Sequence, residues 1–365
     1  LGKSFIYPDY DIKLDVGNFF SNHFAILGNS GSGKSYSVAK ILQGIFYQCK
    51  SLPFYSNIFL FDAYGEYQRA FSRIHEVNEN INYKVYTTDL NSSEFEIIQM
   101  PFWLLGLDDL CLLMNVTSKE QIPFIEKALK LVSYFSRNED EIINQKNDII
   151  ARCLLDVLFS GKSPSMIRNK FISILTKFST RNLNLDVSLV KGGWTRTIRQ
   201  CLFVEAGGEF SDVEVVIEYL ESLCLDNFEL SMPNGEFMYT MKDFSVALDF
   251  ALISEGALNS DSAFELSNVL KVRFNSLMNS NYARYFEYNG YINREGYINY
   301  LLTTSNGRKA QIVNFNINYV DDRFAKTLVK IYSKLLFDYL VSLNQRGSIP
   351  FHIVLEEAHR YVQND

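Results

Sequence analysis

Short apolar runs near both ends of the chain contrast with helical periodicity in its middle. The runs His23–Leu27, Asn57–Asp62 and Tyr83–Tyr86 predict strands near the N-terminus. Phe351–Leu355 predicts another strand, and its continuous apolar character is typical of a strand buried on both faces of a parallel sheet. From about residue 107 to residue 280, apolar positions recur instead at the spacing of an α-helix. The pattern predicts an α/β core with an inserted helical bundle.

Local signals mark the beginnings of two helices in the middle block. Ser118, with Gln121 three residues later, has the spacing of a capping box. Ser211 with Glu214 has the same spacing. Further helices are expected over residues 36–48, 264–278 and 321–343.

Two returning strands are expected after the helical block. Tyr297–Thr303 and Ala310–Asn316 have strand-like composition, and Gly307 and Arg308 between them suit a hairpin turn. The chain starts at Leu1 and stops just after a motif typical of the middle of a domain, so we expect further sequence on both sides. The expected segments are the first half of the core at 1–100, a mainly helical insertion at 101–290 and the second half of the core at 291–365.

A glycine-rich loop separates the first expected strand from the helix over residues 36–48. It fits the phosphate-binding pattern G-x-x-x-x-G-K-[ST] at every fixed position, from Gly28 to Ser35. A strand, a glycine loop and a helix in this order aim backbone N–H groups and a helix N-terminus at a phosphate. The alternative is a glycine-rich turn that merely precedes a helix.

The positions of this loop predict a nucleoside triphosphate with magnesium, ATP and Mg²⁺ being the expected pair. Lys34 is expected to reach the β- and γ-phosphates, and Ser35 to place its hydroxyl on the metal ion. The glycines admit backbone conformations that are closed to other residues. The expected nucleotide-binding residues are Gly28, Asn29, Ser30, Gly31, Ser32, Gly33, Lys34, Ser35 and Tyr36.

Two acidic residues follow the C-terminal strand. Glu356 is expected to hold Mg²⁺, directly or through water, and Glu357 to orient and deprotonate the attacking water. The carboxyl ends of parallel strands are where open α/β sheets bind their ligands. An acidic helix start after a core strand is the alternative.

A third acidic segment follows the strand at 57–62. Asp62 and Glu66 are candidate catalytic residues that touch the metal-bound water or a neighbouring subunit. The alternative is a turn closed by Asp62 and Gly65, because Asp and Gly are frequent turn residues.

Composition narrows the class of protein. An apolar content of 47% in 365 residues indicates a globular chain, and the net charge of −7 argues against a general nucleic-acid coat, though not against a narrow basic channel. The five cysteines include no C-x-x-C pair, which suits reduced thiols in a cytoplasm. No membrane span or signal peptide is visible.

Local clusters of cations are the candidates for DNA contact. Lys191, Arg196 and Arg199 accompany two glycines and Trp194, an arrangement in which a flexible backbone could follow phosphates; a solvated loop is the alternative. A second cluster lies over residues 162–181, where the solvent-exposed face of a helix is the favoured explanation. Arg273 and Arg284 either reach across a subunit interface or form salt bridges.

Taken in order, these motifs resemble the HerA-like branch of the HerA/FtsK P-loop ATPases. Ala63-Tyr64 stands where that family has Pro-His, and Glu356 where many P-loop ATPases have Asp. The resemblance also includes Asn314-Phe315-Asn316-Ile317. The other matching segments are residues 14–16, 23–35, 62–67, 101–105, 335–337 and 356–360.

The resemblance implies a RecA-like core and a hexameric ring that moves double-stranded DNA. It also implies an effector partner, often a nuclease, or a sirtuin-like subunit in defence against phage. The family's arginine finger would lie beyond residue 365. A ring that serves as a scaffold for the effector, without sustained translocation, is the alternative function. An unrelated P-loop kinase or transporter ATPase is disfavoured, because the chain has no LSGGQ-like signature.

Overall fold

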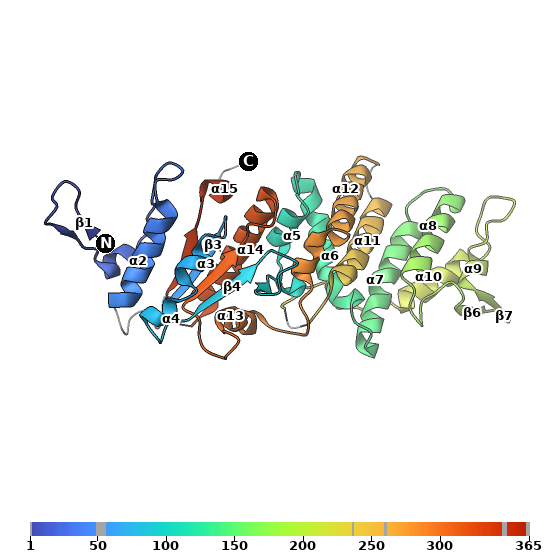
Figure 1. Ribbon diagram of the computed structural model, residues 1–365. Coiled ribbons are helices and arrows are strands. Elements are labelled where there is room, and N and C mark those ends of the chain that lie inside the picture. Colours follow the sequence, from blue (N-terminus) through green and yellow to red (C-terminus); the bar gives the residue numbers. More distant parts are fainter. Residues whose placement is uncertain (1, 49–55, 236, 259–260, 345–348, 363–365) are drawn as a thin grey trace. The chain divides into compact units, whose positions relative to one another are not determined.

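The chain divides into two structural units, Leu1–Leu104 with Glu287–Asp365 and Leu105–Phe286. The computed structural model describes residues 2–48, 56–235, 237–258, 261–344 and 349–362 (Figure 1). The second unit is thus inserted between the two halves of the first. None of the helices in these described ranges is long and apolar enough to cross a membrane.

A five-stranded sheet forms the centre of the first unit, and all its strand pairs are parallel. Its order is β5-β4-β8-β3-β9, so the chain crosses over between neighbouring strands. Because the strands are parallel, their carboxyl ends meet at one edge of the sheet. The strands are β3 (Asn57–Asp62), β4 (Tyr83–Thr87), β5 (Glu96–Ile97), β8 (Ile312–Asn316) and β9 (Phe351–Leu355).

Helices cover both faces of this sheet, giving three layers (Figure 1). On one face Leu42 of α2 (Lys34–Gln48) and Phe71 of α3 (Tyr67–Phe71) join Leu60 in a buried cluster. On the other face Phe315 stacks on Phe61 and packs against Tyr332 of α14 (Asp322–Ser342). Successive strand residues point to opposite faces, and both faces of the sheet are covered, so the interior of β3 is apolar on both sides. Strand β8 differs, because Asn314 and Asn316 lie on one of its faces.

Shorter elements complete the first unit. Asp15 caps α1 by accepting hydrogen bonds from two backbone N–H groups, and Asp321 caps α14 in the same way at Phe324. These elements are β1 (Gly2–Lys3), β2 (Asp11–Ile12), α1 (Val16–Phe20), α4 (Ile74–Val77), η2 (Phe102–Leu104), α13 (Arg294–Leu302) and α15 (His359–Val362).

The second unit is mainly helical, as its periodicity predicts. Phe135, Phe178 and Phe250 bring three helical segments together through ring contacts of 5.0 to 5.8 Å. Its elements are α5 (Leu107–Leu113), η3 (Lys119–Gln121), α6 (Ile122–Phe135), α7 (Asp140–Leu158), α8 (Pro164–Lys177), β6 (Ser188–Lys191), β7 (Trp194–Thr197), α9 (Ile198–Cys201), α10 (Val213–Ser222), α11 (Met241–Leu258), α12 (Asp261–Met278) and η4 (Asn281–Phe286).

The strand expected at His23–Leu27 is wrong. These residues have no regular secondary structure, and the side chains of Phe24 and Leu27 are 47% and 89% exposed. An apolar run becomes a strand only when a neighbour supplies partners for its N–H and C=O groups. Among the described residues the sheet ends at β9, and no strand lies beside 23–27. The expectation that β9 is buried on both faces is also wrong, because Ile353 is 40% exposed at this edge.

The strand expected at Tyr297–Thr303 is a helix, α13. Asn293 caps its first turn by accepting a hydrogen bond from Gly296 N–H. Tyr297, Ile298 and Leu301 are buried together, at the spacing of one helical face. The expected pair of strands is therefore not formed, although an antiparallel bridge joins Thr303 to Lys309 around a turn in which Gly307 has φ +77°.

Two details of the helical block also differ from expectation. Residues 188–197 form the antiparallel pair β6–β7 and not a flexible loop. Helix α10 is preceded by Asp212 as N-cap, without a side-chain cap bond, while Ser211 donates instead to Phe203 O. Ser118 does cap the helical turn η3 through Glu120 N–H, as expected.

Candidate active site

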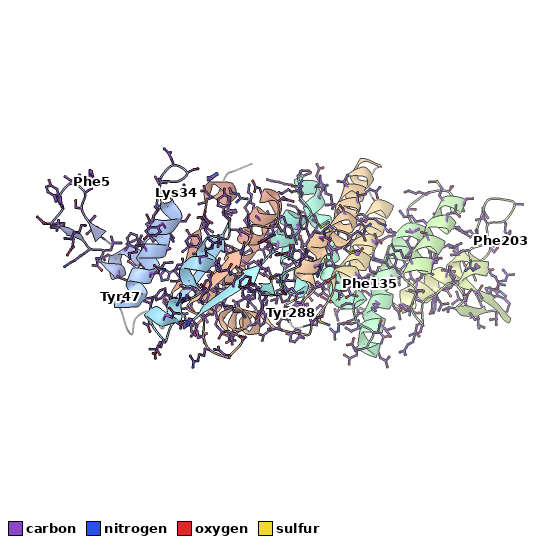
Figure 2. The ribbon with its side chains drawn as sticks, in the orientation of Figure 1. Phe5, Lys34, Tyr47, Phe135, Phe203 and Tyr288 are labelled. Atoms are coloured by element: carbon purple, nitrogen blue, oxygen red, sulfur yellow. The ribbon has the colours of Figure 1, made fainter. Side chains whose placement is uncertain are left out.

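The phosphate-binding loop precedes α2, and Lys34 is the first residue of that helix (Figure 2). Gly31 and Gly33 have φ values of +77° and +86°, which side-chain-bearing residues rarely adopt. At Gly28 a Cβ atom would lie 2.3 Å from Ser32 Oγ. Gly31 and Gly33 thus supply the backbone conformation of the loop, and Gly28 leaves room for the Ser32 side chain.

The Lys34 side chain folds back along the loop. Its Nζ donates to Gly28 O at 3.0 Å and to Asn29 O at 3.4 Å. The same atom lies 3.7 Å from Glu357 Oε1. A cation is thus held between the loop and the acidic end of β9, where phosphate oxygens would find it. Tyr36, two residues further on, is exposed at the surface of α2.

Glu356 joins the loop to the sheet edge through both of its oxygens. Oε1 accepts a hydrogen bond from Ser35 Oγ at 2.9 Å, and Oε2 accepts one from Ala63 N–H at 2.9 Å. The pKa of this carboxyl is raised to about 7, mainly because burial disfavours the charge and then because Asp62 lies near; the Ser35 hydrogen bond opposes the shift. The two hydrogen bonds orient the carboxylate, and burial leaves it with little water. A nearby cation would therefore stabilise its charged form.

Glu357 has a strained backbone. Its φ of 49° is in the left-handed region, which it shares with Asn115 alone among the described non-glycine residues. Its carboxylate lies near Lys34 and 3.3 Å from His359 Nδ1. Residues held in such conformations cost about 1–3 kcal/mol and concentrate at functional sites. The strain turns this side chain toward the phosphate-binding loop.

Asp62 is completely buried, and its carboxylate is occupied by hydrogen bonds within the protein. Oδ1 accepts from Glu66 N–H at 3.0 Å, and Oδ2 accepts from Tyr67 N–H at 3.1 Å. Gly65 has φ +73° in the same turn. The geometry is that of a turn closed by Asp62, while the Glu66 side chain is exposed at the start of α3.

Two residues of this edge have no role in the sequence-based assignment. Asn314 donates through Nδ2 to Asp62 Oδ2 and to the Tyr83 hydroxyl. Tyr67 is buried, and its pKa is raised first by burial and then by the charge of Glu356. The asparagines of a buried strand were the available signal for Asn314, because a buried polar side chain must find a partner.

The residues present fit a magnesium ion held together with phosphates. Ser35 Oγ and Glu356 Oε1 are hard oxygen ligands that meet at one point. Within the described part of the chain, no group of three or more His, Cys, Asp or Glu residues could hold a metal. Mg²⁺ usually takes one or two protein oxygens and completes its shell with waters and substrate phosphates, so two converging oxygens are sufficient.

Lys191, Arg196 and Arg199, the first group of candidate DNA contacts, lie on and beside the β6–β7 pair in the second unit. Lys191 Nζ is 3.6 Å from Glu214 and 3.5 Å from Glu218. Arg196 pairs with Asp212 and lies over the Trp194 ring, and Arg199 is 3.9 Å from Asp186. Each of the three cations therefore has an acidic neighbour.

Among the other candidate cations, Lys177 and Arg273 have partners and Lys170 is partly buried, whereas Arg284 is exposed. In the second cluster Lys177 pairs with Asp249, and burial lowers the pKa of Lys170. Arg273 donates to the backbone carbonyls of Met114 and Asn115. Arg284 is exposed on η4.

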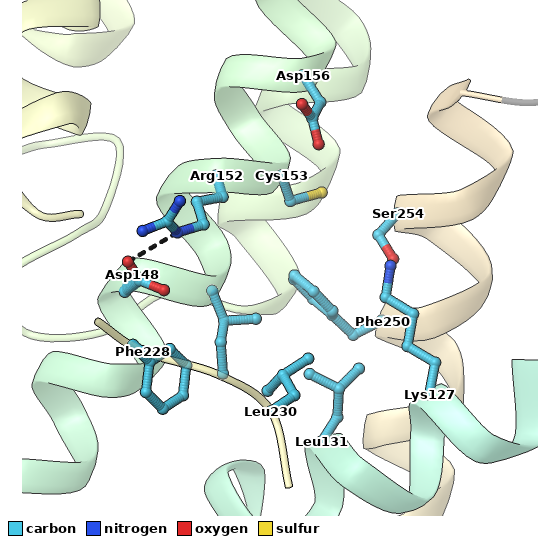
Figure 3. Close-up of a pocket in the computed structure, with 11 residues that line it drawn as sticks. Lys127, Leu131, Asp148, Arg152, Cys153, Asp156, Phe228, Leu230, Phe250 and Ser254 are labelled. Atoms are coloured by element: carbon cyan, nitrogen blue, oxygen red, sulfur yellow. Dashed lines mark hydrogen bonds and ion pairs between the residues drawn. The ribbon is translucent and has the colours of Figure 1, made fainter. Parts of the chain in front are cut away.

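A cavity of about 280 Å³ lies within the helical unit (Figure 3). Leu131, Phe228 and Phe250 contribute apolar walls. Two of its charged side chains bind each other: Asp148 pairs with Arg152 at 2.9 Å and also accepts a hydrogen bond from the backbone N–H of Leu225. These bonds tie the segment containing Phe228 to α7 and give Asp148 and Arg152 a structural role.

Comparison with known proteins supports one family. The family described as "Helicase HerA, central domain" matches residues 1–184, about half of the chain. A protein named "Probable helicase MJ1565" from Methanocaldococcus jannaschii is 27% identical over 147 residues, 38% of this chain and 24% of that protein. The "DNA double-strand break repair helicase HerA" of Pyrococcus furiosus is 47% identical over 45 residues, 12% of this chain and 8% of that protein.

The matched segments thus span at most about a quarter of those relatives' length. The family match contains the phosphate-binding loop and the Asp62 turn, which converge with β9 in the structure. On the family match and the five-stranded parallel core together, this chain belongs to the family of the HerA helicase central domain.

Proposed function

We propose that this chain is an ATP-hydrolysing motor subunit that moves double-stranded DNA. The hydrogen bond of 2.9 Å between Ser35 and Glu356 carries the proposal, because it brings the phosphate-binding loop against the carboxylates after β9. Binding a triphosphate needs the first element, and hydrolysing it needs the second. The names of the two relatives, a probable helicase and a DNA double-strand break repair helicase, support this proposal.

Each site residue has a distinct part in the proposed hydrolysis. The loop amides and Lys34 hold the phosphates and neutralise charge that develops on the γ-phosphate. Ser35 and Glu356 would hold Mg²⁺, which supplies further charge neutralisation. Glu357 orients the attacking water and accepts its proton. Asp62 and Glu66, in the neighbouring turn, are proposed to contact the metal-bound water or a neighbouring subunit.

The assembly and its partners are also proposals. We propose a homo-hexameric ring with DNA at its centre, acting in the cytoplasm with a nuclease or a sirtuin-like effector subunit in defence against phage. The family membership supports the ring and the DNA, whereas the effector follows from the resemblance to defence ATPases. Lys191, Arg196 and Arg199 are the proposed DNA contacts.

A scaffold function is the second candidate. In it, the ring assembles and regulates an effector without sustained translocation of DNA. The observation that favours it is the pairing of all three proposed DNA contacts with acidic residues, in a chain of net charge −7. DNA must displace those acids before the cations can meet its phosphates.

The rate of ATP hydrolysis with and without duplex DNA separates the two functions. For a motor, DNA raises the rate of the wild type, and Glu357→Gln abolishes hydrolysis in both conditions while the protein still binds ATP. The matched control is Glu221→Gln, a surface change on α10. A rate indifferent to DNA, with effector activity that survives Glu357→Gln, would exclude the motor and leave the scaffold.

A further inference from the structure

Two hydrogen bonds, joined by the peptide bond between Asp62 and Ala63, lead from strand β8 to the Glu356 carboxylate. We propose that Asn314, at the β8 end of this connection, is a positioning residue for nucleotide hydrolysis: it holds Asp62 and, through the turn after β3, fixes the orientation of Glu356. The inference rests on the proposed ATPase function, but its structural part can be measured without nucleotide.

Asn314 is completely buried in β8, between β3 and β4. Its Nδ2 donates to Asp62 Oδ2 at 3.1 Å and to the Tyr83 hydroxyl at 2.8 Å. Its Oδ1 has no hydrogen-bond partner among the described residues. A buried unpaired acceptor costs about 1–3 kcal/mol. An apolar residue would avoid that cost, so the amide donors are the reason to have asparagine here.

The carboxylate of Asp62 transmits this anchoring to the chain after β3. It is buried and receives three N–H donors: one from Asn314, one from Glu66 and one from Tyr67. The two backbone donors close the turn, and the side-chain donor fixes the carboxylate to the sheet. Without Asn314 the turn keeps its internal bonds and its backbone pairing with β8, including Ile317 N–H to Asp62 O, but the Asp62 carboxylate loses its side-chain bond to that strand.

The turn in turn holds Glu356. Ala63, its first residue, donates its N–H to Glu356 Oε2, while Ser35 donates to Oε1. Movement of the turn therefore displaces one of the two groups that orient this carboxylate. The phosphate-binding loop is held by separate bonds, such as Lys34 to Gly28 O, and should keep its shape.

The alternation of β8 supports the same interpretation. Asn314 and Asn316 are two residues apart and so share one face of the strand. A Cβ on Gly65 would lie 3.1 Å from Asn316 Nδ2, which places Asn316 directly against the turn. Phe315, on the opposite face, stacks on Phe61 at 5.1 Å. The strand thus supports the turn with amides on one face and packs its phenyl ring into the core on the other.

The test compares Asn314→Leu with wild type in steady-state ATP hydrolysis. The variant should lower kcat by about 10- to 100-fold and raise the Mg²⁺ concentration for half-maximal rate, as losses of residues supporting metal ligands do. The KM for ATP should stay within about threefold, because the loop that binds the phosphates is unchanged. This separation of kcat from KM is not expected from general loss of folded protein.

Amide hydrogen exchange gives a readout that needs no nucleotide. In Asn314→Leu the amides of residues 63–67 should exchange about tenfold faster or more, whereas those of α14 should be unchanged. If the wild type does not hydrolyse ATP, the proposed function fails. Faster exchange at 63–67 would even then support the positioning role.

Two controls distinguish an effect on the orientation of the carboxylates from a general loss of folding stability. Val313→Ala changes the same strand on its other face and should lower the melting temperature without a matching fall in kcat. Asn314→Asp should be worse than Asn314→Leu, because it brings a second carboxylate to Asp62. Adding Asp62→Asn should recover part of the loss, because the new amide at position 62 donates to the new carboxylate at position 314.

Three results would overturn the inference. The first is a kcat and a Mg²⁺ dependence in Asn314→Leu that equal those of the wild type. The second is a fall of kcat in Val313→Ala as large as in Asn314→Leu at equal melting temperature, and the third is unchanged amide exchange at residues 63–67 in Asn314→Leu.

Discussion

Ser35 Oγ donates to Glu356 Oε1 at 2.9 Å across 321 positions of sequence. The serine belongs to the helix that follows the phosphate-binding loop, and the glutamate follows an edge strand of the parallel sheet. This contact brings the phosphate-binding loop and the acidic residues after β9 together, and these are the two halves of the proposed hydrolytic site. The inserted helical unit separates these halves in sequence but not in space.

Removing the loop lysine should abolish nucleotide binding. In Lys34→Ala we expect the affinity for a fluorescent ATP analogue to fall by at least about 100-fold, because the loop loses the charge that faces the β- and γ-phosphates. Hydrolysis should fall to background. The control is Lys40→Ala, which removes an exposed cation from the same helix and should bind like wild type. Normal hydrolysis by Lys34→Ala would show that the nucleotide site is elsewhere.

The raised pKa of Glu356 predicts a pH-dependent effect on stability. Its folded-state pKa of about 7 lies above the usual 4.5, so the folded protein favours the protonated form. That contribution is complete below about pH 4.5 and is lost as the pH rises through about 7. Glu356→Gln does not titrate, so its advantage over wild type should grow between pH 5 and pH 8, to about 1–2 kcal/mol.

Melting temperatures measured with a chelator present across that pH range test this. A gain of a few degrees at pH 8 that shrinks toward pH 5 is the expected result. Glu221→Gln, at an exposed position, should show no such trend. A constant difference between Glu356→Gln and wild type would mean that the carboxyl titrates normally in the folded protein.

The parts of the site that local sequence could predict are those with local physical causes. The shape of the loop from Gly28 to Ser35 depends on the backbone conformations of its own glycines. Glu356 and Glu357 directly follow a strand that can be predicted from its apolar residues. The link between Asn314 and Asp62 depends instead on the pairing of β8 beside β3, which joins positions far apart in sequence. A buried asparagine indicates that a partner exists but does not say which one.

The wrong strand predictions have a similar origin. His23–Leu27 has strand composition but no neighbouring strand among the described residues to pair with it. Tyr297–Thr303 is equally rich in aromatic and β-branched residues, yet Asn293 caps a helix there and three residues at helical spacing are buried. Composition alone does not distinguish a strand from a helix in so short a segment.

The left-handed backbone of Glu357 predicts an inverted order of stability between two substitutions. At an ordinary helical position glycine is less stable than alanine by about 0.5–1 kcal/mol. At φ 49° alanine meets the steric cost and glycine does not, so Glu357→Gly should be more stable than Glu357→Ala by about 1 kcal/mol. Both variants should lose hydrolysis.

Chemical denaturation of the two variants measures this difference. Lys40→Gly and Lys40→Ala, within helix α2, provide the reference pair and should show the usual order. Equal or reversed stabilities at position 357 would contradict the backbone conformation, and retained hydrolysis in either variant would contradict the role of the carboxylate.

The β6–β7 pair should contribute to DNA affinity if it lines the path of DNA. Replacing Lys191, Arg196 and Arg199 together by alanine should weaken duplex binding and reduce the slope of log affinity against log salt by up to about 2.7, at roughly 0.9 for each phosphate contact. Conversely, Glu214→Gln with Glu218→Gln should strengthen binding, because it frees Lys191 from its two acidic neighbours. Fluorescence anisotropy of a labelled duplex over a salt series measures both effects. Unchanged affinity and slope in both variants would remove the pair from the DNA path and favour the scaffold function.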